Sequence, residues 1–198
     1  MKTPARWIIV AVLLGVYLLA FFAMLHPRVS AAYKSYYIDE NSLDWNPEHY
    51  PSRPEQGMTF SREGLPDWVE TTYGFSLRDP WGRWTDADLS KTPALLFTRP
   101  FDGTLCLGFT ACPARALIGK TFAVQMGNQT KTLKAFPQGY AEYQVQFMDI
   151  RGANRLSFLL PKNLPREHEV DPGNDDARRL GLNLTALRIR PGSCAPAQ

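Results

Sequence analysis

The residues of this sequence best suited to chemistry form two short clusters. The first runs from Asp79 to Asp86 and contains two tryptophans, two aspartates and one arginine. Tryptophan rings offer flat apolar surface, and the charged side chains supply hydrogen-bond donors and acceptors. A sugar has apolar C–H faces and hydroxyl edges, so this mixture favours carbohydrate binding. The alternative is a buried tryptophan corner in which Arg83 and Asp86 pair internally to order a loop.

The second cluster, Asp171 to Gly181, mixes acids and bases just before the last predicted strand. This pattern fits either a ligand site or an ion-paired loop that holds the strand in place. Dense aspartate is also typical of calcium sites, which need six to eight oxygen ligands. The arginines Arg178 and Arg179 oppose a bound cation, so calcium is disfavoured.

The usual motifs of catalysis are missing from the sequence. It contains no nucleophile elbow, phosphate-binding loop, dinucleotide fingerprint or zinc-protease motif. Its histidines, His26, His49 and His168, are isolated from one another, and no cysteine pair has metal-ligand spacing with a nearby histidine. The sequence therefore favours a non-catalytic protein and implies no metal or cofactor.

The sequence contains three cysteines, and an odd number does not fit a disulfide framework. Cys106 and Cys112 lie on one predicted strand, about 20 Å apart. A disulfide needs Cα atoms within about 7 Å, so these two are not expected to pair. Cys194 lies in a predicted tail that can reach Cys112, which makes Cys112–Cys194 the candidate disulfide.

Composition narrows the class of protein. The 198 residues are 44% hydrophobic, which excludes a chain disordered throughout. Lysine and arginine number 22 against 19 acidic residues, and this balance excludes a nucleic-acid binder that works by counterion release.

From residue 57 onward the pattern of the sequence is that of β-structure. Short segments of alternating apolar and polar residues are separated by turn signals every ten or so residues. This pattern predicts an all-β fold, an antiparallel, jelly-roll-like β-sandwich. The predicted strands cover residues 58–61, 69–76, 94–99, 104–111, 122–126, 130–135, 140–148, 155–160 and 180–190.

The N-terminal segment has a different character. Residues 7–25 carry no charge and, as a helix, span roughly 28 Å, close to the thickness of a hydrocarbon core. With the basic leader of residues 1–6, they predict a retained transmembrane signal anchor. The alternative is a cleaved signal peptide with its cleavage site at residues 29–31. Either way, the C-terminal part is expected in the periplasm, with the anchored form single-pass in a bacterial inner membrane.

The remaining boundaries follow from composition. Residues 26–56, rich in tyrosine, proline and acidic residues, read as an extended connector. Residues 57–191 form the predicted β-sandwich domain, and residues 192–198 form a flexible tail.

Several blocks of the sequence occur in a recognisable order. These are MTFSREGLPDWV, GFSLRDPWGRWTDA, LGFTACPARALIGKTFAVQMGNQ, PKNLPRE and DDARRLGLNLTALRI. They resemble the C-terminal accessory domain of bacterial membrane-bound phosphoglycerol transferase I, an enzyme that decorates osmoregulated periplasmic glucans. Similar domains occur in other membrane proteins of glycan assembly. The resemblance covers about residues 57–190 and implies a periplasmic β-sandwich held beside a membrane.

The resemblance does not imply transferase activity, because the family's sulfatase-like catalytic domain with its metal-bound threonine has no counterpart here. Residues 113–117 also depart from the family's pattern, and an asparagine contact is lost there. The matched positions give the candidate ligand-binding residues, which are Trp81, Arg83, Trp84, Asp86, Asp176 and Arg178.

The sequence thus predicts a membrane-anchored periplasmic accessory protein of glycan modification or assembly, whose β-sandwich binds carbohydrate without catalysis. The alternative is a structural subunit that docks onto a membrane glycosyl- or phosphoglycerol transferase without binding sugar. Phosphoglycerol transfer by the chain itself is the least favoured hypothesis. The expected partners are therefore a glycan or a membrane-bound glycan-modifying enzyme, and the inner membrane through residues 7–25.

Overall fold

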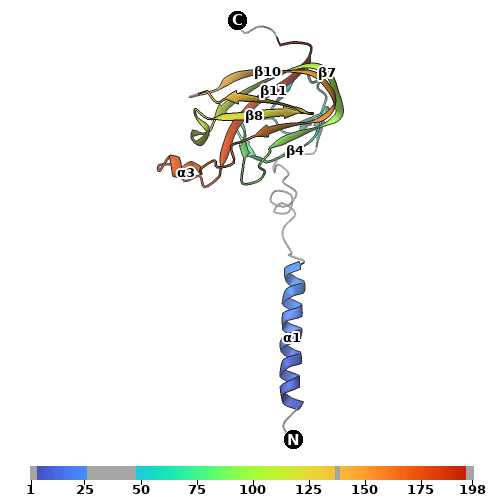
Figure 1. The fold of residues 1–198 in the computed structure, drawn as a ribbon, viewed down its shortest axis with the longest axis vertical. Helices are drawn as coiled ribbons and strands as arrows, with labels where there is room; N and C mark the ends of the chain where they lie inside the picture. The colour runs from blue at the N-terminus through green and yellow to red at the C-terminus, as the bar shows by residue number, and fades with distance from the viewer. Residues whose placement is uncertain (1–3, 26–47, 137–138, 195–198) are drawn as a thin grey trace. The chain divides into compact units, whose positions relative to one another are not determined.

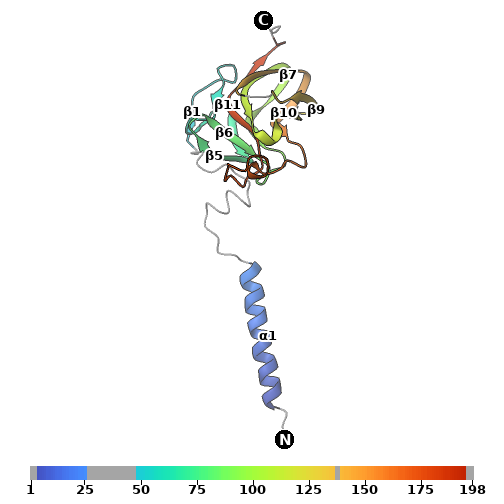
Figure 2. The same ribbon diagram turned by 90° about the vertical axis from the view of Figure 1, so that its left-hand side faces the viewer.

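The computed structural model describes residues 4–25, 48–136 and 139–194 (Figures 1 and 2). The chain divides into two compact units, residues 1–34 and residues 35–198. Each unit is described by itself below.

The first unit contains a single described helix, α1 (Pro4–Leu25), where the sequence predicts the membrane anchor. Within the described part of the chain, however, no helix combines the length and apolar character needed to cross a membrane. The predicted transmembrane span is therefore not supported.

The second unit is built from β-strands. Its strands are β1 (His49–Tyr50), β2 (Met58–Thr59), β3 (Leu65–Pro66), β4 (Val69–Tyr73), β5 (Phe75–Asp79), β6 (Gly82–Asp86), β7 (Ala94–Pro113), β8 (Thr121–Met126), β9 (Gln129–Lys134), β10 (Ala141–Leu159) and β11 (Leu180–Pro191). Two short helices, η2 (Arg115–Leu117) and α3 (Glu167–Val170), lie in the connections. The β-structure therefore starts before residue 57, inside the predicted connector, whose residues 26–47 lie outside the described part.

Two long antiparallel strands, β7 and β10, organise the domain. The second half of β7 pairs with β11 and with the first half of β10, and β11 pairs in turn with β6. The first half of β7 pairs with β4, and the last part of β10 pairs with β8. Each long strand thus takes part in two layers. Both change layer where their register shifts, near Gly103 and Gly152, which adopt positive φ values.

The hydrophobic core lies between these layers. Phe109 on β7 belongs to the first layer. The centre of its ring lies 5.6 Å from that of Phe158 on β10 and 6.4 Å from that of Phe122 on β8, and both of these residues belong to the second layer. Odd-numbered residues of β7 from Leu105 to Ala111 are buried in this core. Even-numbered residues of β7 therefore point away from it, because successive side chains alternate across a strand. The described residues of this unit are mostly antiparallel β-sheet, which confirms the predicted all-β class and is consistent with the predicted β-sandwich.

Some element boundaries differ from the prediction. The segments 94–99 and 104–111 form one strand, β7, because Pro100 falls where pairing with β10 is irregular and no ladder hydrogen bond is lost. The segments 140–148 and 155–160 likewise join as β10. The predicted strand 69–76 is divided at Gly74, whose φ of +70° bends the chain between β4 and β5.

The disulfide also differs from the prediction. Cys194 pairs with Cys106, with Cα atoms 4.9 Å apart, and Cys112 is free. The register explains this result, since Arg190 lies opposite Cys106 and Gly192 turns the tail back over β7 with a φ of +91°. Cys112 lies opposite Asn183, at the other end of β11. The predicted pair Cys112–Cys194 is therefore wrong.

Candidate functional site

The β5–β6 hairpin carries the first predicted cluster and separates its residues. On β6, Trp84 lies opposite Asn183 of β11, and Arg83 lies opposite Leu184. Alternation therefore places Trp84 and Arg83 on opposite faces of the layer. Leu184 belongs to the core, and Arg83 on the same face is fully buried, with Nη1 donating to the Ser76 carbonyl at 3.3 Å. Arg83 thus stabilises the hairpin from within.

The two remaining members of this cluster lie at opposite ends of β6. Trp81 occupies the hairpin turn and is 69% exposed. Asp86 ends the strand and is buried, with Oδ1 accepting a hydrogen bond from the Asp88 amide at 2.9 Å. Burial raises the pKa of the Asp86 carboxyl above its usual range. The cluster that looks compact in the sequence is therefore not one site in the structure.

The second predicted cluster forms a local ion pair. Asp176 accepts hydrogen bonds from the Arg178 backbone amide at 3.0 Å and from the Arg178 guanidinium at 2.6 to 3.1 Å. These bonds hold the pKa of Asp176 below its usual range. The Asp176 carbonyl also accepts from the backbone amide of His168 at 3.1 Å, which joins this loop to α3.

Further ion pairs surround this loop. Asp88 accepts from Arg179 at 2.6 Å and lies 3.4 Å from Arg166. The charge of Arg178 also acts on Asp86, so the two predicted clusters approach each other here. Three of the six predicted residues, Asp86, Asp176 and Arg178, thus come together. Their geometry is that of the ion-paired loop, and their role in ligand binding stays a prediction.

A different set of side chains shares the solvent-directed face of the first layer, which we call the outer face. Residues directly opposite each other in an antiparallel ladder share a face, so register identifies the set. The outer face comprises Trp84 of β6, Asn183, Ala186, Arg188 and Arg190 of β11, Cys106, Gly108, Thr110 and Cys112 of β7, and Glu142, Gln144 and Gln146 of β10. It combines one tryptophan of β6 with polar groups from three strands, β11, β7 and β10.

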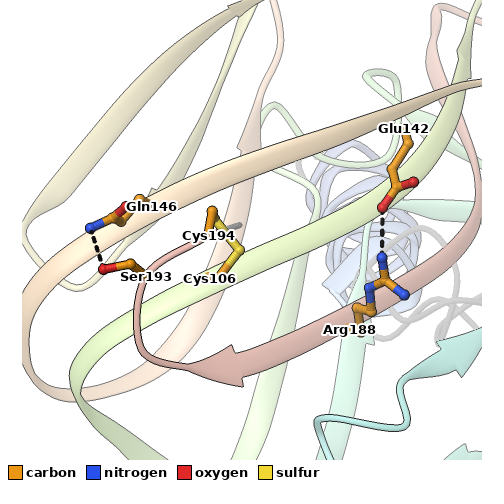
Figure 3. Close-up of a disulfide and its surroundings, with 6 residues drawn as sticks. All are labelled: Cys106, Glu142, Gln146, Arg188, Ser193 and Cys194. Carbon is orange, nitrogen blue, oxygen red and sulfur yellow. Dashed lines mark hydrogen bonds and ion pairs between the residues drawn. A yellow bond between two sulfur atoms is a disulfide. The ribbon is translucent and has the colours of Figure 1, made fainter. Parts of the chain in front are cut away.

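An ion pair crosses the middle of the outer face. The Arg188 side chain from β11 reaches over β7 and donates to Glu142 Oε1 on β10 at 2.6 Å (Figure 3). Gly108 permits this path, because a Cβ atom at that position would stand 3.2 Å from Arg188 Nε. At one end of the face, the disulfide pins the tail, and Gln146 donates to Ser193 at 3.4 Å (Figure 3).

A pocket of about 320 Å³ opens beside this ion pair. Its floor is the outer face around Gly108 and Arg188, and its wall is the segment 50–62. In this wall, the Arg62 guanidinium lies 3.7 Å from the centre of the Tyr50 ring. Burial raises the pKa of Tyr50, and the charge of Arg62 partly offsets that rise. The pocket therefore presents a guanidinium where Tyr50 would otherwise present an aromatic face.

Asn183 and Cys112 lie toward the opposite end of the outer face from the disulfide. Asn183 is 1% exposed, and its Oδ1 atom has no hydrogen-bond partner within the described residues. The Cys112 thiol beside it is half-buried, and burial raises its pKa, so the reactive thiolate form is disfavoured. Among the residues that the structure describes, no three histidine, cysteine or carboxylate side chains are placed to hold a metal ion.

Comparison with protein families gives one match. Residues 45–191, most of the chain, match the family described as "Domain of unknown function (DUF7024)". The chain belongs to the DUF7024 family. No curated protein is significantly similar to it.

Several solved structures resemble this DUF7024 domain in part. One is a mutant of a family 29 carbohydrate binding module, at 14% identity and a TM-score of 0.41, covering 68% of this chain and 90% of the module. Another is the CBM36-1 domain of a xylanase from the hindgut metagenome of Trinervitermes trinervoides, at 13% identity and a TM-score of 0.38, covering 57% and 80%. At such TM-scores the similarity carries no argument about function.

The sequence alone missed the pocket because its parts are far apart in the chain. Arg188 and Glu142 are separated by 46 residues and meet only through the pairing of β11, β7 and β10. One signal was present in the sequence. Glu142, Gln144 and Gln146 alternate with apolar residues, which marks a polar face on that strand.

Proposed function

We propose that this DUF7024 domain is a non-catalytic module that binds a glycan on its outer face. The observation that carries the proposal is the shared direction of Trp84 and the polar side chains of β11, β7 and β10, next to a pocket of about 320 Å³. A flat indole supplies apolar contact area, and amide, hydroxyl and charged groups fix the hydroxyl edges of a sugar.

The biological setting is part of the same proposal. The domain acts as an accessory protein in modification or assembly of a glucan of the osmoregulated periplasmic type, as its resemblance to the phosphoglycerol transferase accessory domain implies. The disulfide Cys106–Cys194 supports export, because disulfides persist in oxidising compartments such as the periplasm. The N-terminal apolar segment then serves in export, as an anchor or as a cleaved leader.

Titration of the full-length protein in detergent with β-glucan oligosaccharides tests the proposal. We expect calorimetric heat and a change in tryptophan fluorescence. Trp84→Ala should weaken binding by about five- to 150-fold if an indole stacked on a sugar resembles an aromatic residue stacked on a nucleic-acid base, whose replacement by alanine costs roughly 1–3 kcal/mol. Trp81→Ala, at the exposed hairpin turn, is the matched control and should bind like the unmodified protein. Absence of heat and of any fluorescence change across the oligosaccharides would count against glycan binding.

One observation favours the alternative, a structural subunit that docks onto a membrane transferase. Trp81 is 69% exposed and Leu77 is 51% exposed, both on the β5–β6 hairpin. Exposed aromatic residues are common anchors of protein interfaces. If the docking alternative holds, a stoichiometric enzyme partner is recovered from solubilised membranes with Trp84→Ala but not with Trp81→Ala.

A further inference from the structure

The pocket beside the outer face contains more positive than negative charge. Among its lining residues, two arginines, Arg62 and Arg188, face one glutamate, Glu142. Arg188 is already paired with Glu142 at 2.6 Å. The excess charge therefore belongs to Arg62.

Arg62 differs from the other arginine in its surroundings. Within the described residues no carboxylate lies within ion-pair distance of its guanidinium, whose recorded contact is the face of Tyr50 at 3.7 Å. Stacking on the ring holds the planar guanidinium in place while its N–H groups stay available at the edge. A guanidinium fixed in this way is prepared to bind an oxyanion with two parallel hydrogen bonds.

The same contact removes the pocket's aromatic platform. A neutral sugar gains affinity by stacking its C–H face on a ring, but Arg62 covers the face of Tyr50 that it contacts. Arg190 adds a further positive charge to the outer face, two residues along β11 from Arg188. The pocket therefore suits a negatively charged substituent better than an unsubstituted ring.

We propose that the pocket between segment 50–62 and the outer face binds an oxyanion on the glycan, either a carboxylate or a phosphate. This inference rests on the proposed glycan binding and specifies the class of ligand. Arg62 is the primary contact. Arg188, held across Gly108 by its ion pair with Glu142, lies in the floor of the pocket.

The test compares ligands that differ only in charge. Neutral gluco-, manno- and galacto-oligosaccharides are titrated into the full-length protein, alongside the same oligosaccharides oxidised to carboxylates at C6 or phosphorylated at C6. We expect at least one charged form to bind about tenfold tighter than its neutral parent, since charge-assisted hydrogen bonds exceed neutral ones by this order. The carboxylate and phosphate arms show which oxyanion is preferred.

Variants assign the effect to the pocket. Arg62→Gln should remove the preference for the charged form, so that the charged oligosaccharide and its neutral parent bind with similar affinity. Arg62→Lys keeps the charge but loses the planar fork, so it should retain only part of the preference. Arg151→Gln, at an exposed site on the bend of β10, changes the net charge equally and should have no effect. Raising the salt concentration from about 0.15 M to 1 M should weaken the binding of the charged ligands selectively, because the Debye length falls from about 8 Å to about 3 Å.

Two results overturn the inference, and they are distinguishable. If neutral and charged forms bind equally well and Arg62→Gln changes neither, the oxyanion site is wrong while glycan binding stands. If no oligosaccharide binds in either form, glycan binding itself fails, and the inference fails with it.

Discussion

Removal of the disulfide should destabilise the domain by several kilocalories per mole. The bridge joins residues 88 positions apart, Cys106 and Cys194. In the chain-entropy treatment, a disulfide that closes a loop of that length lowers the conformational entropy of the unfolded chain, which stabilises the folded state by about 4.6 kcal/mol at 25 °C. Removing a native disulfide typically lowers the free energy of unfolding by about 2–5 kcal/mol. Dividing by a urea m-value of about 2 kcal/mol/M, we expect the midpoint of unfolding to fall by about 1–2.5 M.

Urea unfolding of single cysteine variants, prepared under oxidising conditions, measures this effect. Cys194→Ser is the most direct variant, because Cys194 lies after the last strand and contributes little else to the fold. Cys106→Ser should produce a loss of similar size, and the double variant should be little worse than either single one, since both remove the same bond. Cys112→Ser leaves the bridge intact and serves as the control.

The result that would refute this reasoning is also specific. If Cys112→Ser lowers the midpoint as much as Cys194→Ser while Cys106→Ser does not, the bridge is Cys112–Cys194. Alkylation of the unfolded, unreduced protein gives an independent answer. Only Cys112 should carry the label, because it is the free thiol.

Three further predictions concern buried and close-packed groups. Burial raises the pKa of Glu167, so from pH 4.5 up to that raised value the folded state binds the extra proton and the free energy of unfolding falls as pH rises. Glu167→Gln should make this fall smaller, as measured by urea unfolding across pH 4 to 8, and should leave the part that comes from Asp86, whose pKa burial also raises. Arg83→Ala should lower the free energy of unfolding by about 3 kcal/mol, measured by heat or urea, because it empties a fully buried site. The control Arg151→Ala, at an exposed site, should change it by less than about 0.5 kcal/mol. Equal effects of the two variants would contradict the buried placement of Arg83. Gly108→Val should displace the Arg188 side chain from β7 and break its ion pair with Glu142, at little cost to stability. A crystal structure of the variant checks the ion pair, and its unfolding curve checks the stability. An undisturbed ion pair would show that the glycine is not needed there.

The strands were predictable where alternation and turn chemistry agree. The hairpin β8–β9 follows from alternating residues on both sides of Gly127-Asn128, and β11 follows from its leucines. Strand β6 was not predicted, because its inward side chains are Arg83 and Thr85 rather than apolar residues. A pattern of hydrophobicity cannot identify a strand whose buried face is polar.

The candidate site was less predictable than the fold, for a related reason. The density of aromatic and charged residues around Trp81 and Trp84 favoured one compact ligand site. Alternation on β6 instead directs Arg83 into the core, and the hairpin turn separates Trp81 from the strand's outer face. Closeness in sequence is a poor guide on a strand, where neighbours point to opposite sides.

The disulfide also shows where prediction from local sequence ends. The sequence correctly separated Cys106 from Cys112, since that argument needed only the rise of one strand. Choosing between them as partner of Cys194 needed the register of β11 against β7, which places Arg190 opposite Cys106. No local pattern in the sequence encodes that register.

The proposed oxyanion pocket depends on such long-range register throughout. Arg188 must lie opposite Gly108, and Gly108 opposite Gln144 of β10, for the guanidinium to pass over β7 and meet Glu142. A slip of one residue between β11 and β7 would turn Arg188 into the core and Ile189 toward solvent. The buried faces of these strands forbid that slip, so the hydrophobic core that holds the layers together also fixes the charges of the outer face. If the proposed oxyanion pocket is correct, the register of three strands therefore sets both the stability of the domain and its ligand selectivity.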